Sequence, residues 1–330
     1  MSRWNPYKQP FIIFSLIMVA VILRLFLMNY WETIEVDGVA YASIARDWIE
    51  GKGLDISFIP PVYPLAIGFL FHLVGNYELS GRLISVVSGG LLILPVFLLS
   101  QKLYNKQTAY YAATLTLLYP ILAKYSTTVL TESIYTLLLI TMLYMVLLAL
   151  EANRIFYWIG GGVLVGIGSL VRPELLGYLP YIFGIYFAMF LKKRVKLSIL
   201  CKNLSALLLA SMIFAVPYMF SIRGVSGKVN VFTIKRVVGE RNFYRAADEI
   251  FQKEGFHAKD TKIIDPLQMA RASIINLQLL HKFVIPELFP PLIIVMIGIG
   301  LFRMQFSNFV NRWDEIFILL SCIPYITYLW

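Results

Sequence analysis

The chain has 330 residues, of which 59% are hydrophobic and only 15% charged, and its mean hydropathy is +0.73. A soluble domain is about half apolar and about one-quarter charged, so this composition excludes an ordinary soluble protein and predicts a multi-pass integral membrane protein. The formal charge of +10 is scattered over short connections between apolar runs rather than gathered on one face. This pattern favours a role in membrane orientation, and we expect no nucleic-acid partner.

Nine apolar runs predict an all-α integral membrane fold, a bundle of about nine transmembrane helices. Each run is, within boundary error, near the roughly 20 residues that cross a bilayer as a helix. The first run carries Arg24 and is followed by no small-residue cleavage site, so we interpret it as a retained helix rather than a signal peptide. The runs span residues 11–30, 79–99, 109–123, 133–150, 155–171, 175–190, 197–220, 284–301 and 316–330.

A shorter apolar run at residues 63–74 decides the orientation. It gives only ~18 Å of helix, against a hydrocarbon core of about 30 Å, which favours an interfacial or re-entrant helix. Basic loops accumulate in the cytoplasm, and placing the loop at residues 192–196 there also puts Lys102, Lys106 and the amino-terminal tail inside, provided that 63–74 does not span. Residues 31–78, 124–132, 172–174 and 221–283 then lie on the outer face.

The first outer loop, residues 31–78, begins with an acidic segment that includes Glu35 and Asp37. In an extended stretch, residues two apart point the same way, so these two carboxylates could converge on one site. A helix with an apolar stripe follows and is expected to lie in the membrane surface. Asp37 just precedes this stripe, so capping of the helix is an alternative role, and a helix start also attracts anions.

An ordered set of motifs in residues 20–190 resembles the bacterial GT-C glycosyltransferases. Within them it is most similar to the branch related to protein O-mannosyltransferases and to the aminoarabinose transferase of lipid A. The set consists of Arg24, Asp37-Gly38-x-x-Tyr41-x-x-x-Ala45, Gly51-x-Gly53, Pro60-Pro61-x-Tyr63-Pro64, Gly81-Arg82-Leu83, Thr131-Glu132-Ser133 and Val171-Arg172-Pro173-Glu174.

The resemblance implies an enzyme that moves a monosaccharide from a polyprenyl-phosphate donor to a lipid, glycan or protein acceptor on the non-cytoplasmic face. In that family an acid in the first outer loop is the proposed base, which maps onto Asp37, and a second acid maps onto Glu132. Many relatives carry two adjacent acids at the first position. Here Gly38 follows Asp37 and the nearest acid is Glu35, which leaves a metal site at this position open.

Physical chemistry assigns further expected roles to the outer helix ends. Arg172 is the first candidate to balance the charge of the lipid phosphate, since its planar fork matches phosphate oxygens. A snorkelling arginine, or one paired with Glu174, is the alternative. Glu132 could orient the acceptor or hold a divalent ion, or it could simply be a carboxylate favoured by the helix dipole. The motifs add Glu174, Tyr41 and Tyr63 to the substrate-binding residues, and Glu35 joins them as the acid nearest to Asp37.

The expected arrangement is one GT-C-like transmembrane domain over residues 1–330, in the plasma membrane of a bacterium, with its site facing outward. A transporter or lipid flippase is the competing class. Transporters place ionisable groups near the midplane and show internal repeats, whereas here the acids lie at helix ends and no repeat is evident. The chain stops at Trp330 inside an apolar run, an ending compatible with a missing C-terminal part.

Overall fold

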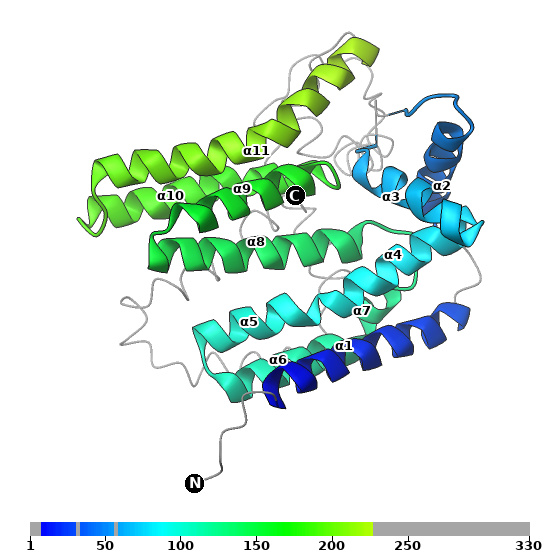
Figure 1. Cartoon of the computed structure of the whole chain (residues 1–330), viewed down its shortest axis with the longest axis horizontal. Helices are drawn as coiled ribbons and strands as arrows, with labels where there is room; N and C mark the ends of the chain where they lie inside the picture. The colour runs from blue at the N-terminus through cyan, green and yellow to red at the C-terminus, as the bar shows by residue number, and fades with distance from the viewer. Residues whose placement is uncertain (1–7, 31–33, 56–58, 227–330) are drawn as a thin grey trace, which may run out of the picture. The chain divides into compact units, whose positions relative to one another are not determined.

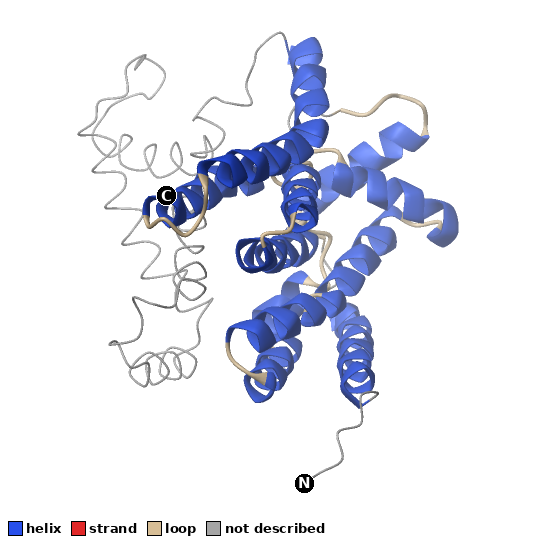
Figure 2. Ribbon diagram, turned by 60° about the vertical axis from the view of Figure 1, so that its left-hand side comes forward, coloured by secondary structure: helices blue, strands red, loops and turns tan. Residues whose placement is uncertain are grey.

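The computed structural model describes residues 8–30, 34–55 and 59–226. The chain divides into two compact units, residues 1–228 and 229–330, and the second lies outside the described residues. The predicted runs 284–301 and 316–330 and nearly all of the outer loop 221–283 therefore lie outside them too. Every described element is helical, with loops between (Figure 2), which confirms the predicted all-α class.

Two of the described helices, α4 (Tyr77–Leu91) and α6 (Lys106–Leu118), begin after a capping asparagine. Asn76 and Asn105 accept hydrogen bonds from the backbone of the helices that they precede, as N-cap residues do. The elements are α1 Lys8–Leu27, η1 Met28–Tyr30, α2 Val36–Ile49, α3 Val62–Val74, α4 Tyr77–Leu91, α5 Ile93–Leu103, α6 Lys106–Leu118, α7 Pro120–Tyr125, α8 Glu132–Ala152, α9 Ile155–Ser169, η2 Pro173–Gly177, α10 Tyr178–Leu191 and α11 Leu197–Ser226 (Figure 1).

Five helical segments of the described part are long and apolar enough to cross a membrane. Two of the spans expected in this part are not among the five. Pro120 lacks a backbone N–H and separates α6 from α7 within the run 109–123, and the run 155–171 forms the shorter apolar helix Ile155–Ser169. Pro95 also removes the backbone N–H that would bond to Leu91, where α4 ends, but the run 79–99 still lies within one candidate span. The five segments are Gln9–Tyr30, Tyr77–Leu103, Glu132–Ala152, Pro173–Leu191 and Leu197–Ser221.

The long helix α8 lies at the centre of this unit. It packs against α4 and α5 on one side and α9 on the other, and α11 covers α9 (Figure 1). At the periphery, α1 exposes Phe11, Phe14, Ile22 and Phe26. Large exposed aromatic and aliphatic side chains on a long apolar helix are typical of a surface that faces lipid.

A buried arginine compensates for the break after α6. Arg24 is fully buried in α1 and donates from Nη2 to the carbonyl oxygen of Thr116, at 3.3 Å, and from Nη1 to that of Ala20, at 3.2 Å. The carbonyl of Thr116 would normally bond to the N–H of residue 120, which Pro120 lacks. Arg24 therefore satisfies a backbone acceptor that has lost its helical partner, next to the negative end of the α6 dipole.

Close packing of α9 on α11 depends on glycine. A Cβ at Gly166 would lie 2.7 Å from the carbonyl oxygen of Ser211, and one at Gly162 would overlap the backbone of Leu207. Small residues allow such backbone approach between membrane helices, so Gly162 and Gly166 serve the packing of α9 on α11.

Replacing Gly162 by Ala is expected to lower the free energy of unfolding by roughly 1–3 kcal/mol, the usual effect of overpacking. The measurement is the melting temperature of the purified protein in detergent. Gly184 in α10 is the matched control, because a Cβ there meets nothing within 4 Å. Equal melting temperatures for the Gly162→Ala and Gly184→Ala proteins would contradict the proposed packing.

The first outer loop forms two helices, α2 and α3, which pack against each other. The ring of Trp48 in α2 contacts Phe69 of α3 at 5.3 Å, and Ala45 is buried with Tyr63, Ile67 and Val129. The apolar stripe of α2 thus packs against protein, and the location of this helix in the membrane surface stays a prediction.

Candidate functional site

Arg172 and Glu132 form an ion pair where α8 begins and α9 has just ended. The Nη2 of Arg172 donates to Oε1 of Glu132 at 2.7 Å, and its Nε donates to Oγ1 of Thr131 at 2.8 Å. Pro173 forces the preceding residue into an extended conformation, and Arg172 has φ −146° and ψ 122°. The two side chains are 28% and 26% exposed, so the pair lies at an edge that a solute could reach.

Helix α2 brings Tyr41 and Asp37 to the same place. Gly38 permits the approach, because a Cβ there would lie 2.8 Å from the carbonyl oxygen of Val129. The side chain of Tyr41 is hydrogen-bonded to Thr131 and lies within electrostatic range of Arg172, Glu132 and Asp37.

Burial is the largest influence on the pKa of Tyr41 and raises it. The bond to Thr131 and the charge of Arg172 lower it, and the two acids raise it. The phenol therefore stays protonated and able to donate a hydrogen bond at neutral pH.

Asp37 lies in the first turn of α2, one helical turn before Tyr41, so the two share a face of the helix. Its side chain is exposed. The alternative role of Asp37 as the N-cap is wrong, because Glu35 is the N-cap residue, without a capping side-chain bond. The extended geometry expected for Glu35 and Asp37 is also wrong, since the helix has already begun at Val36.

Tyr63 supports the site from beneath. It is fully buried, its ring packs edge-on against Tyr41 at 5.2 Å, and its hydroxyl bonds to the carbonyl of Gly81 and to Ser85. Desolvation raises its pKa strongly. The predicted role in substrate binding therefore cannot involve direct contact in this conformation.

Arg172 pairs with Glu132 rather than with Glu174, which was the alternative expected from its position two residues away. Glu174 lies in η2, and its Oε2 is buried without a hydrogen-bond partner in the described part of the chain. The Oε2 of Glu132 is also buried without a hydrogen-bond partner in the described residues. Arg172 therefore satisfies only one of the two carboxylate oxygens of Glu132.

Thr131 and Tyr135 contact Arg172 but were not predicted as site residues from the sequence. Thr131 connects Tyr41 to Arg172, and the guanidinium of Arg172 lies over the ring of Tyr135 at 5.8 Å. Thr131 belongs to one of the recognised motifs, which is a signal that could have found it. Tyr135 follows Thr131 by one helical turn. That its side chain lies beside Arg172 could be inferred only once the start of α8 was known.

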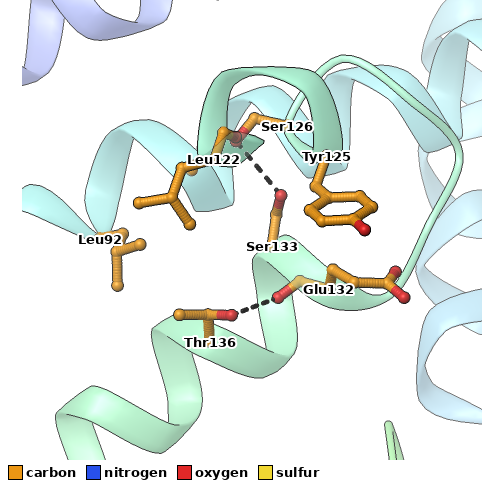
Figure 3. A pocket seen from close by; sticks show the side chains of 8 residues that line it. Leu92, Leu122, Tyr125, Ser126, Glu132, Ser133 and Thr136 are labelled. Carbon is orange, nitrogen blue, oxygen red and sulfur yellow. Dashed lines mark hydrogen bonds between the residues drawn. The ribbon is translucent and has the colours of Figure 1, made fainter. Parts of the chain in front are cut away.

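A cavity beneath Glu132 is too small for a sugar. Its volume is about 20 Å³, enough for on the order of one water molecule. In Figure 3, the Ser133 hydroxyl points to Ser126, while the carboxylate of Glu132 extends to the Tyr125 side, away from Leu92. A substrate must therefore approach the carboxylate from the open edge that Arg172 shares.

The acids of the site were also candidates to hold a divalent ion. Within residues 8–30, 34–55 and 59–226, no three carboxylate, imidazole or thiolate side chains come together as a metal site. Oε1 of Glu132 is already engaged by Arg172. The described residues alone do not make up a site for a divalent ion.

Comparisons with known proteins address the family and the fold. Residues 59–220 match the family model described as dolichyl-phosphate-mannose-protein mannosyltransferase. A comparison with curated sequences gives no match. Among solved structures, the chain is similar to the oligosaccharyltransferase of Archaeoglobus fulgidus in complex with Zn and sulfate, with a TM-score of 0.59 and 16% identity.

That structural match covers 96% of this chain but only 46% of the archaeal one, so the chain spans about half the length of that protein. At this identity the likeness shows the fold alone. The family match includes Tyr63, Glu132 and Arg172 and ends within α11. The resemblance seen in the sequence is thus confirmed: residues 59–220 match the mannosyltransferase family, and the chain has the fold of a GT-C glycosyltransferase.

Proposed function

We propose that the protein is a membrane glycosyltransferase that moves a monosaccharide from a polyprenyl-phosphate donor to a lipid, glycan or protein acceptor on the non-cytoplasmic face of a bacterial plasma membrane. The observation that carries the proposal is the meeting of Asp37, Tyr41, Glu132 and Arg172 at one edge of the helix bundle. The family match of residues 59–220 supports the reaction class.

The proposed reaction is a single displacement at the anomeric carbon. The acceptor hydroxyl attacks that carbon, and the bond from the carbon to the phosphate oxygen breaks, so the lipid phosphate leaves with one more negative charge. Asp37 takes the proton of the attacking hydroxyl. Its exposed position suits this role, because a general base must come within hydrogen-bond reach of the acceptor.

Arg172 would stabilise the charge that develops on the leaving phosphate. Its guanidinium is oriented by Thr131 and Glu132 before any substrate binds, and preorganised cations at a surface of low dielectric constant are effective in this role. Glu132 has Oε1 on Arg172, and its Oε2 is buried. In this conformation Glu132 therefore holds the arginine.

A transporter or flippase remains the second candidate class, because it would also be polytopic. The described acids argue against it. Asp37, Glu132 and Glu174 all lie at the starts of helical elements, whereas transport sites are typically built on interrupted helices near the bilayer midplane.

The test of the proposed function is release of polyprenyl phosphate by the full chain in membranes supplied with a panel of labelled polyprenyl-phosphate sugars. We expect at least one donor to be consumed, with its label appearing on a membrane component. The same membranes with the Asp37→Asn protein are the matched control. Movement of labelled donor across the bilayer without sugar release would favour a flippase and overturn the proposal.

A further inference from the structure

One face of α4 holds the segment between α7 and α8, residues 126–131, hereafter the 126–131 loop. Gly81, Ser85 and Gly89 are spaced four residues apart and so lie on one face of the helix. A Cβ at Gly81 would come within 2.6 Å of Cγ1 of Val129, and one at Gly89 would overlap the hydroxyl of Ser126. The loop is therefore seated directly against the backbone of α4.

Two side chains of α4 bind backbone carbonyls of this loop. Oγ of Ser85 donates to the carbonyl oxygen of Leu130 at 3.1 Å and lies 3.0 Å from the hydroxyl of Tyr63. Each hydroxyl has one proton, so when Ser85 donates to Leu130, Tyr63 can donate either to Ser85 or to the carbonyl oxygen of Gly81, which lies 3.1 Å away. Either bond links α3 to α4, and Ser85 links α4 to the residue that precedes Thr131.

Arg82 connects the loop to the end of the first helix. Its side chain is only 8% exposed and is paired with Glu78 at 2.7 Å. Its Nη1 lies 3.4 Å from the carbonyl oxygen of Thr127 and 3.3 Å from that of Met28. Met28 opens η1, which leads toward the acidic segment before α2, and Thr127 leads toward Glu132. One guanidinium thus links the two segments that carry the acids.

We propose that Ser85 and Arg82 are positioning residues, which fix the 126–131 loop so that Thr131 and Glu132 meet Tyr41 and Arg172. The kinetic part of this inference rests on the proposed function, whereas the structural part does not. The loop ends at Thr131, which bonds to both Tyr41 and Arg172, so a displaced loop would displace both partners of the ion pair.

Hydrogen–deuterium exchange of the full-length protein in detergent tests the structural part. Ser85→Ala and Arg82→Met should each speed exchange of the amides between residues 126 and 135, because local opening becomes easier when the bonds that hold a segment are lost. Ser80→Ala is the matched control. Ser80 is also a buried serine of α4, but its hydroxyl bonds to Asn76 at the start of the same helix. Wild-type exchange in both test proteins would overturn the inference.

Kinetics test the catalytic consequence. Ser85→Ala should lower kcat by about two- to tenfold, the range for loss of one neutral hydrogen bond, and leave the KM for the donor unchanged. Arg82→Lys should restore part of the activity lost in Arg82→Met, since a lysine can reach one carbonyl but cannot fork to two. An equal fall in Ser80→Ala would contradict a positioning role. A wild-type protein without transferase activity would refute the proposed function, and the exchange experiment would still decide the role of α4.

Discussion

Replacing Asp37 by Asn should lower kcat for sugar transfer by about 10²- to 10⁴-fold, the usual contribution of a positioned general base. The amide keeps the size of the side chain but cannot accept the proton of the attacking hydroxyl. Because Asp37 is exposed in the first turn of α2, its replacement should leave folding nearly unchanged. The measurement is single-turnover transfer from the preferred labelled donor.

Glu50→Gln is the control for Asp37→Asn. Glu50 is also an exposed acid of α2, but it is the C-cap residue at the other end of the helix and pairs with Lys52. We expect Glu50→Gln to retain kcat within about threefold, a difference of less than 1 kcal/mol in activation free energy. Near-native turnover of Asp37→Asn, in protein with normal melting temperature, would exclude Asp37 as the base.

Arg172→Met should lower kcat/KM for the donor by roughly 10- to 100-fold, since hydrogen bonds from a charged donor are worth about 1.5–3 kcal/mol. The loss should concentrate on the donor, because the charge that Arg172 balances is that of the phosphate. Varying the donor and the acceptor independently measures this split. Unchanged dependence on donor concentration would count against a phosphate role.

The ion pair with Glu132 gives this experiment an internal control. Removing Arg172 alone leaves a half-buried carboxylate without its cation, which is itself costly. Glu132→Gln and the double variant complete a double-mutant cycle. If Arg172 acts only by pairing with Glu132, the double variant should be no worse than Glu132→Gln. A further loss of donor use in the double variant would identify the direct contribution of Arg172.

Much of the fold could be predicted from the sequence because hydropathy directly reports burial in lipid. The seven amino-terminal apolar runs all correspond to helices. The prediction missed the interruptions at Pro95 and Pro120, although both prolines were visible, because a window of about 20 residues averages over one residue. The packing of α2 on α3 was missed for another reason. An amphipathic stripe has the same period whether it faces a bilayer or another helix.

The site was predicted less completely than the fold. The resemblance to the family indicated Asp37 and Glu132, and Arg172 stood out as a cation at the outer end of an apolar run. The partner of Arg172 could not be found in this way, since Glu174 is close in sequence whereas Glu132 is 40 residues away. That choice is made by the packing of α8 beside α9. The contributions of Ser85 and Arg82 depend on which carbonyls face α4, and the sequence does not encode this locally.

The bond between Arg24 and Thr116 has a consequence for biosynthesis. The two residues are 92 positions apart, so α1 leaves the ribosome long before its acceptor is made. Arg24 lies in the last turn of α1, where an arginine disfavours membrane insertion less than at the centre of a helix. The other residues of α1 are apolar enough for it to enter the bilayer. Its guanidinium can bond to Ala20 within α1 at once, but the bond to Thr116 must wait until α6 is made.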